Sequence, residues 1–90
     1  ANTLINLATV YYKLGQLNPC EEYANQSLEA FHELKDLHGL AITYTTLGNV
    51  AEKRGDPDKA LKMYQMAEVN ARKADKPATL APVLQSMGLL

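Results

Sequence analysis

Side chains that could carry chemistry are few in this sequence and poorly spaced for it. His32 and His38 lie six residues apart with no acid or cysteine to complete a metal-ligand set, so we expect no metal and no cofactor. Cys20 occupies a small, buried position, so we expect packing and not nucleophilic reactivity. No Ser/His/Asp, Cys/His or paired-carboxylate arrangement can be formed, and the chain is not expected to be an enzyme.

Two short motifs have simpler explanations than their chemistry. Asn25-Gln26-Ser27 matches a glycosylation sequon but falls in the middle of an expected helix, so we treat the match as accidental. Arg54-Gly55-Asp56 looks like an adhesion tripeptide, yet a glycine followed by aspartate is also how one helix stops and the next begins. The chemistry of the chain must therefore come from a surface that its helices build.

Composition bounds the class of protein. The 90 residues include twelve Ala and fourteen Leu, a mixture that favours closely packed helices. Nine basic and ten acidic residues give a net charge of −1, which offers no case for nucleic-acid binding. The single cysteine excludes an internal disulfide. The uncharged stretch 77–90 is shorter than the ~20 apolar residues of a membrane helix, so we expect no membrane insertion and a cytoplasmic location.

A shift of the sequence by forty residues reveals an internal repeat. Six residues of the first unit recur unchanged in the second, namely Ala1, Thr3, Leu7, Val10, Lys13 and Gly15 at 41, 43, 47, 50, 53 and 55. The chain therefore divides into repeat 1 (1–40), repeat 2 (41–80) and the first ten residues of a third repeat (81–90), which is cut short.

Each repeat reads as two helices. In the second repeat, the apolar face of the first helix is formed by Leu40, Tyr44, Leu47, Val50 and Ala51, and Gly55 ends that helix. Asp56-Pro57 predicts the start of the next helix. The inner side of this next helix carries Ala60, Leu61, Tyr64, Ala67 and Ala71. In the first, the corresponding face is Leu4, Leu7, Val10, Tyr11 and Leu14. Gly15 ends that helix, and Asn18-Pro19 with Glu21 predicts a capping box. The inner side of the following helix is expected to carry Cys20, Ala24, Ser27, Leu28, Phe31 and Leu34.

These residues resemble a tetratricopeptide repeat. The second unit matches the family signature with Tyr44-x2-Leu47-Gly48-x2-Ala51, then Gly55, then Ala60-x3-Tyr64-x2-Ala67. The resemblance implies an all-α fold, an α-solenoid of antiparallel helix pairs with about five helices in a right-handed superhelical stack. The forty-residue period is longer than the standard repeat and is similar to the long-repeat branch of kinesin light chains and G-protein-modulator-type adaptors.

The resemblance also implies a function. First helices of such repeats line a concave face that binds a peptide segment of a partner protein, and the matching positions are Asn2, Ile5, Asn6, Thr9, Tyr12, Lys13, Ile42, Thr45, Asn49, Glu52 and Lys53. The family's carboxylate clamp for chaperone tails needs Lys, Asn and Arg, whereas the matched positions include Ile5, Thr9 and Thr46. We therefore expect a peptide other than an acidic chaperone tail.

A second function of a different class stays open. The end of the chain carries an uncharged apolar stripe with no following helix to cover it, formed by Leu80, Val83, Leu84, Met87 and Leu90. Because a solenoid end needs a polar cap, this stripe predicts a structural self-association module that forms a homodimer.

Overall fold

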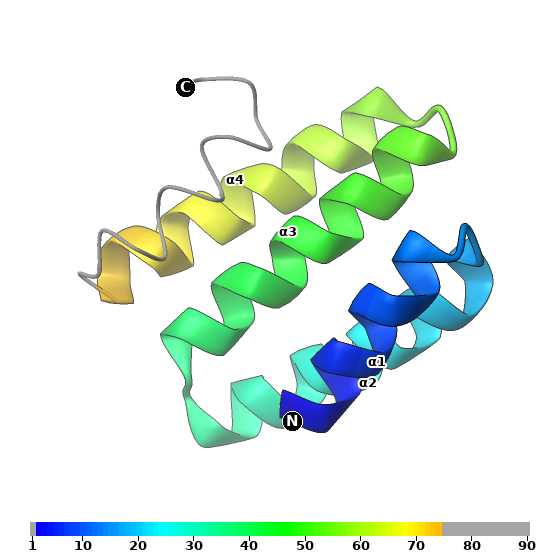
Figure 1. The fold of residues 1–90 in the computed structure, drawn as a ribbon. Coiled ribbons are helices and arrows are strands. Elements are labelled where there is room, and N and C mark those ends of the chain that lie inside the picture. Colours follow the sequence, from blue (N-terminus) through cyan, green and yellow to red (C-terminus); the bar gives the residue numbers. More distant parts are fainter. Residues whose placement is uncertain (1, 75–90) are drawn as a thin grey trace.

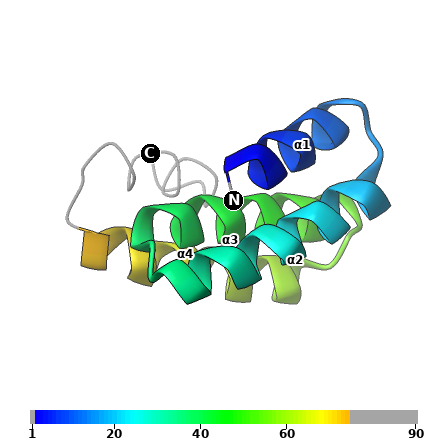
Figure 2. The same ribbon diagram turned by 90° about the horizontal axis from the view of Figure 1, so that it is seen from below.

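Four helices make up the described part of the protein. The computed structural model describes residues 2–74, in the order α1 (Asn2–Lys13), α2 (Leu17–Leu34), α3 (Leu37–Lys53) and α4 (Pro57–Ala74). In Figure 1, α3 lies between α4 and the pair formed by α1 and α2. Seen at 90° in Figure 2, α1 stands on one side of the layer that α2, α3 and α4 form. The all-α fold of helix pairs is confirmed over this range.

Glycine residues and aspartate caps mark the turns between the helices. Gly15 and Gly55 adopt φ of 79° and 78°, a conformation that favours glycine, and they end α1 and α3. The backbone N–H of Lys59 donates to Asp56 Oδ1 at 3.2 Å, and Pro57 is the first residue of α4, as predicted. At the turn between α2 and α3, Asp36 Oδ1 likewise accepts from the N–H of Gly39 at 3.1 Å.

The predicted start of the second helix is wrong by two residues. The helix α2 begins at Leu17, and its N-cap is Gln16, which makes no side-chain capping bond. Asn18 and Pro19 therefore lie in the first turn, where a proline costs no hydrogen bond because those N–H groups have no partner within the helix. The predicted capping box does not form, and Glu21 is free to reach towards α3 and α4.

The core is centred on α3, which is buried on two sides. The predicted apolar face of α3 is buried in full, as are the small residues Cys20, Ala24, Ala60 and Ala67, which let the helix axes approach closely. Two aromatic rings lie directly over glycines of α3, Phe31 over Gly39 and Tyr64 over Gly48. The helices pack mainly on their neighbours in sequence, and α1 also contacts α3.

The predicted inner face of α1 is wrong in part. Leu7, Val10 and Leu14 are exposed, and the buried positions of α1 are Ile5 and Ala8. The reason is position in the stack, because α3 has a helix on either side whereas α1 lies at the edge (Figure 1). Leu34 and Leu61 of the second helices are exposed as well.

The helix ends recur at the spacing of the sequence repeat. The helices α1 and α3 end at residues 13 and 53, and α2 and α4 begin at residues 17 and 57. The predicted fifth helix and the apolar stripe Leu80, Val83, Leu84, Met87 and Leu90 lie outside the described residues, and the handedness of a longer stack stays a prediction.

Candidate functional site

The predicted peptide-binding residues fall on neighbouring surfaces of α1 and α3, which we call the α1–α3 face. On α1, Asn6, Thr9 and Lys13 are exposed and Tyr12 is half-buried. On α3, Ile42, Glu52 and Lys53 are exposed, and Thr45, Thr46 and Asn49 are half-buried. Asn2 is the first residue of α1, but its side chain lies outside the described part of the chain. Two adjacent helices thus present mostly polar side chains to solvent.

Ile5 was predicted to belong to this face, and the structure places it in the core instead. Its side chain is only 7% exposed and lies in the same core cluster as Ala8, Ala41 and Tyr44. Ile5 sits at the edge of the helix face that α1 turns towards α2 and α3, and an isoleucine there is stabilised by burial. We therefore remove Ile5 from the candidate site and keep the other members.

A contact between Tyr12 and Lys53 joins the two halves of the face. The Lys53 ammonium lies over the Tyr12 ring, with Nζ 5.5 Å from the ring centroid, which is the geometry of a cation–π interaction. Burial raises the pKa of Tyr12, and the negative charge of Glu52 raises it further. The Tyr12 hydroxyl is therefore protonated at neutral pH and can donate a hydrogen bond to a ligand carbonyl.

Tyr64 of α4, which was predicted only as a core residue, also contacts the α1–α3 face from the opposite side of α3. The Tyr64 hydroxyl of α4 lies 2.6 Å from Asn49 Oδ1 and 2.9 Å from Glu52 Oε2. Its ring reaches them by crossing α3 at Gly48, where a β carbon would lie 2.5 Å from the ring. Burial and the Glu52 carboxylate raise the pKa of Tyr64 well above its usual value, so this hydroxyl stays protonated. The glycine and tyrosine of the repeat signature were the only sign of this contact in the sequence.

The three groups also fix their own orientation. A hydroxyl has one proton and cannot donate to two acceptors at once. Asn49 Oδ1 and the Glu52 carboxylate therefore share the single proton of the Tyr64 hydroxyl, and both acceptors lie within hydrogen-bond distance of it. These contacts with Tyr64 therefore hold the Asn49 amide and the Glu52 carboxylate in place before any ligand arrives.

The threonines of the face have less to offer. Thr9, Thr45 and Thr46 each donate to the carbonyl four residues earlier in their own helix, at 2.9, 2.8 and 3.1 Å. Their protons are used, and only hydroxyl lone pairs remain for a ligand. The donors that the face has left are chiefly the amide of Asn6, the Tyr12 hydroxyl and the ammonium groups of Lys13 and Lys53.

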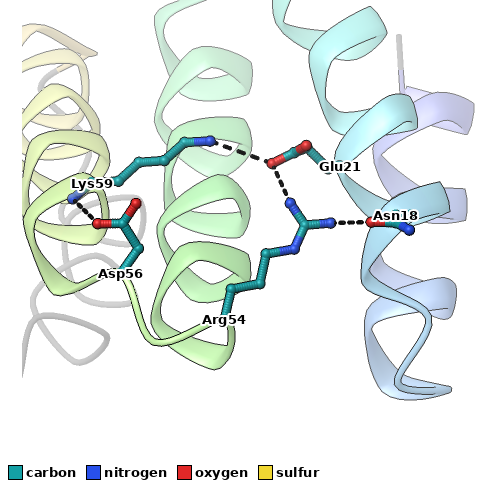
Figure 3. Close-up of polar contacts among 5 residues, drawn as sticks. All are labelled: Asn18, Glu21, Arg54, Asp56 and Lys59. Atoms are coloured by element: carbon teal, nitrogen blue, oxygen red, sulfur yellow. Dashed lines mark hydrogen bonds and ion pairs between the residues drawn. The ribbon is translucent and has the colours of Figure 1, made fainter.

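A second polar cluster lies where α2, α3 and α4 meet (Figure 3). Arg54 donates to Glu21 Oε2 at 2.9 Å and to Asn18 Oδ1, and Lys59 lies 3.5 Å from the same Glu21 oxygen. Partial burial would raise the pKa of Glu21, but the hydrogen bond from Arg54 and the two nearby cations outweigh it and lower that pKa. Beside the cluster is an open depression of about 450 Å³ lined by Gly15, Gln16, Leu17, Asn18, Pro19 and Arg54.

This cluster connects the repeats and leaves the adhesion-like tripeptide without a free binding group. Arg54 is paired with Glu21, and Asp56 caps α4. Elsewhere, Ser27 of the sequon is buried against Thr43, with the two hydroxyls 3.4 Å apart. Cys20 is buried, and burial raises the pKa of its thiol.

Neither a metal site nor a membrane span is found between residues 2 and 74. No group of three or more His, Cys, Asp or Glu side chains in that range could hold a metal ion. None of α1 to α4 is long and apolar enough to cross a membrane.

Comparisons with known proteins give the following matches. The family model described as tetratricopeptide repeat matches residues 1–73. A curated protein from Schizosaccharomyces pombe (strain 972 / ATCC 24843), described as a heat shock protein sti1 homolog, is 34% identical over 73 residues. That match covers 80% of this chain but only 12% of the relative. No solved structure matches the chain significantly.

Proposed function

Because the chain belongs to the tetratricopeptide repeat family, whose repeats generally mediate protein–protein interaction, we propose that its α1–α3 face binds a peptide segment of a partner protein. The observation that carries the proposal is the arrangement of Asn49 and Glu52, which Tyr64 holds from behind the face. Groups fixed before binding lose less conformational entropy on binding, so they favour affinity.

The chemistry of the face suits an extended peptide. Main-chain amides of such a peptide need acceptors, and the Glu52 carboxylate supplies them. Its carbonyls need donors, which the Asn6 amide and the Tyr12 hydroxyl supply. The ammonium groups of Lys13 and Lys53, with Glu52 as the one acidic side chain among the face residues, favour a peptide that carries acidic side chains.

The repeat division is part of the same proposal. We propose repeats at 1–40 and 41–80 with a third beginning at 81, and kinship with the long-repeat branch of the family. The forty-residue spacing of the helix ends supports this division.

The similarity to a heat shock protein sti1 homolog supports chaperone-adaptor binding as a second candidate. The residues at the clamp positions argue against an acidic chaperone tail as the ligand. Ile5 is buried there, and Thr9 and Thr46 have already donated their protons within their own helices. We therefore favour an internal peptide segment over a C-terminal carboxylate.

Three asparagine-to-alanine variants test the proposal. Asn6→Ala and Asn49→Ala alter the α1–α3 face, and Asn25→Ala removes an exposed asparagine of α2, outside that face, as a matched control. The chain is used as bait for proteins from cell extract, which are quantified by mass spectrometry. We expect proteins recovered by the wild type and by Asn25→Ala to be lost with Asn6→Ala and Asn49→Ala. Equal recovery by all four baits would reject the α1–α3 face.

A second measurement separates the two candidate ligands. A fluorescent peptide that ends in an acidic heat-shock tail is titrated with the chain and followed by anisotropy. We expect no saturable binding. Saturable binding that Asn49→Ala weakens would replace the internal segment with a chaperone tail as the ligand.

A further inference from the structure

One end of the α1–α3 face carries all of its charge. Lys13 and Lys53 are the last residues of α1 and α3, and Glu52 directly precedes Lys53. The two helices run in the same direction in Figure 1, and the contact of Lys53 with the Tyr12 ring places their ends side by side. The other members of the face lie nearer the starts of the two helices and are uncharged.

The two ammonium groups at this end have no ionic partner among the described residues. None of the ion pairs formed between residues 2 and 74 includes Lys13 or Lys53. Glu52 is the one acid of the face, and its Oε2 accepts from the Tyr64 hydroxyl at 2.9 Å. Two positive charges thus stand against one carboxylate that is already hydrogen-bonded, so this end attracts an acidic group.

The other end of the face carries an exposed aliphatic side chain. Ile42, in the second turn of α3, is 39% exposed, whereas its neighbours Ala41 and Thr43 are buried. The fold of a repeat does not need an apolar residue here, because the position forty residues earlier is Asn2. No other large aliphatic side chain is exposed among the described members of the face. Ile42 therefore offers an apolar contact that the packing of the four helices leaves unused.

The distance between these two features sets a spacing for the ligand. Ile42 and Lys53 are eleven residues apart, which is close to three full turns, so both lie on the same side of α3. At 1.5 Å per residue they are separated by about 16 Å along the helix. An extended peptide advances about 3.3 Å per residue, so about five residues span that length. Because both features lie on α3, a peptide that meets both must run along this helix.

Resting on the proposed function, we propose that the α1–α3 face selects an extended peptide with an apolar and an acidic side chain about five residues apart. The apolar side chain contacts Ile42, and the acidic side chain pairs with Lys53 and Lys13. Between them Asn49, whose Oδ1 is bonded to Tyr64, can donate from Nδ2 to a main-chain carbonyl. The two anchoring contacts lie at opposite ends of the face, so they contribute separately to affinity.

Selection from a random library tests the spacing. Phage that display random peptides of about 16 residues, long enough for an extended or a helical ligand, are selected on the 90-residue chain. The selected peptides are then tested on Asn49→Ala and on the control Asn25→Ala. Among peptides that Asn49→Ala loses and Asn25→Ala retains, we expect an apolar and an acidic residue about five positions apart more often than in the unselected library.

Two other results of this selection have different meanings. Peptides that depend on Asn49 but lack the expected pair would overturn the spacing and leave peptide binding intact. A pair about eleven positions apart would do the same, because it would indicate a helical ligand. If no selected peptide depends on Asn49, the proposed function itself is rejected, and this inference falls with it.

Paired substitutions locate the two contacts. One selected peptide and its alanine variants at the apolar and at the acidic position are titrated with the chain and followed by fluorescence anisotropy. We expect Ile42→Ala to weaken binding by about fivefold, but only for peptides that keep the apolar residue. The double variant Lys13→Ala/Lys53→Ala should weaken binding only for peptides that keep the acidic residue, and added salt should reduce that effect.

Matched controls come from α4, outside the α1–α3 face. Val69→Ala removes an exposed aliphatic side chain, and Lys62→Ala/Lys73→Ala removes two exposed lysines, so neither should change affinity. Ile42, Lys13 and Lys53 are exposed, and circular dichroism melts should show that their variants fold. Losses that do not depend on the matching peptide residue, or equal losses in the α4 controls, would overturn the proposed contacts.

Discussion

Alanine at position 48 tests how α4 packs on α3. Gly48 lies within a helix, where alanine is more favourable than glycine by about 1 kcal/mol, so helix propensity by itself predicts a more stable protein. The contact with Tyr64 predicts the opposite. A β carbon at position 48 would lie 2.5, 2.6 and 3.0 Å from three ring atoms of Tyr64.

The size of the effect follows from these distances. Carbon atoms in good contact are about 3.5–4.0 Å apart, so the ring must move by about 1 Å. The ring is 5% exposed and its hydroxyl is bonded to Asn49 and Glu52, so it cannot move without breaking contacts. Overpacking of a core costs about 1–3 kcal/mol, and a ring held at both ends belongs at the upper end of that range. After the gain in helix propensity, we expect Gly48→Ala to lose about 2 kcal/mol.

Urea unfolding followed by far-UV circular dichroism measures this loss. The control is the same substitution in a Tyr64→Ala background, where the ring is absent and alanine at position 48 should stabilise the protein by about 1 kcal/mol. Gly39→Ala provides a second site, since a β carbon there would lie 2.3 Å from the Phe31 ring. If Gly48→Ala is as stable as the wild type, the close approach of Tyr64 to α3 is wrong.

Three further predictions concern caps and titrating groups. Asp56→Ala should lower the free energy of unfolding in urea by about 1 kcal/mol because it removes the cap of α4. Gln16→Ala should be nearly neutral because Gln16 makes no capping bond, and equal losses in the two variants would contradict this. Burial and Glu52 raise the pKa of Tyr64, so its contribution to stability is present below its ordinary value of 10.0 and is lost as the pH rises above it. Ultraviolet titration should show one of the five tyrosines ionising last, and Tyr64→Phe should remove that step. The pKa of Glu21 is lowered, so its contribution to the free energy of unfolding is present above its ordinary pKa of 4.5 and is lost as the pH falls below that value. Glu21→Gln should therefore reduce the loss of stability below pH 4.5, by less than about 1 kcal/mol because the ion pair with Arg54 is partly exposed.

Caps and glycine stops predicted most of the helix ends correctly, and they failed at the start of α2, where two possible starts compete. Gly55, Asp56 and Pro57 act through their own backbone and side chains, so they could be interpreted without knowing the fold. Asn18-Pro19 looked like an equally good start, but the first turn of a helix tolerates proline, and α2 begins at Leu17 immediately before them. The cap position is the one forty residues before Asp56, which the repeat itself could have indicated.

The burial of a repeated residue cannot be deduced from the residue. Leu7 and Leu47 are the same side chain at the same place in their repeats, yet one is exposed and the other is in the core. Only the neighbours differ, because α3 has α2 on that side and α1 has no described helix there. Ile5 was predicted on the surface from its place in the repeat, yet it packs in the core cluster with Ala8 and Ala41.

Sequence alone determined the all-α class, the forty-residue spacing of the helix ends and the polar character of the α1–α3 face, because periodicity, glycine stops and residue types act within a few residues of one another. Tertiary structure decided what those residues touch. Tyr64 reaches Asn49 and Glu52 only because Gly48 lets its ring cross α3, and Lys53 lies over Tyr12 only because α1 and α3 stand side by side. These contacts depend on how far apart the helix axes lie and how the helices are rotated about them. Packing sets both, and no spacing within a single helix contains them.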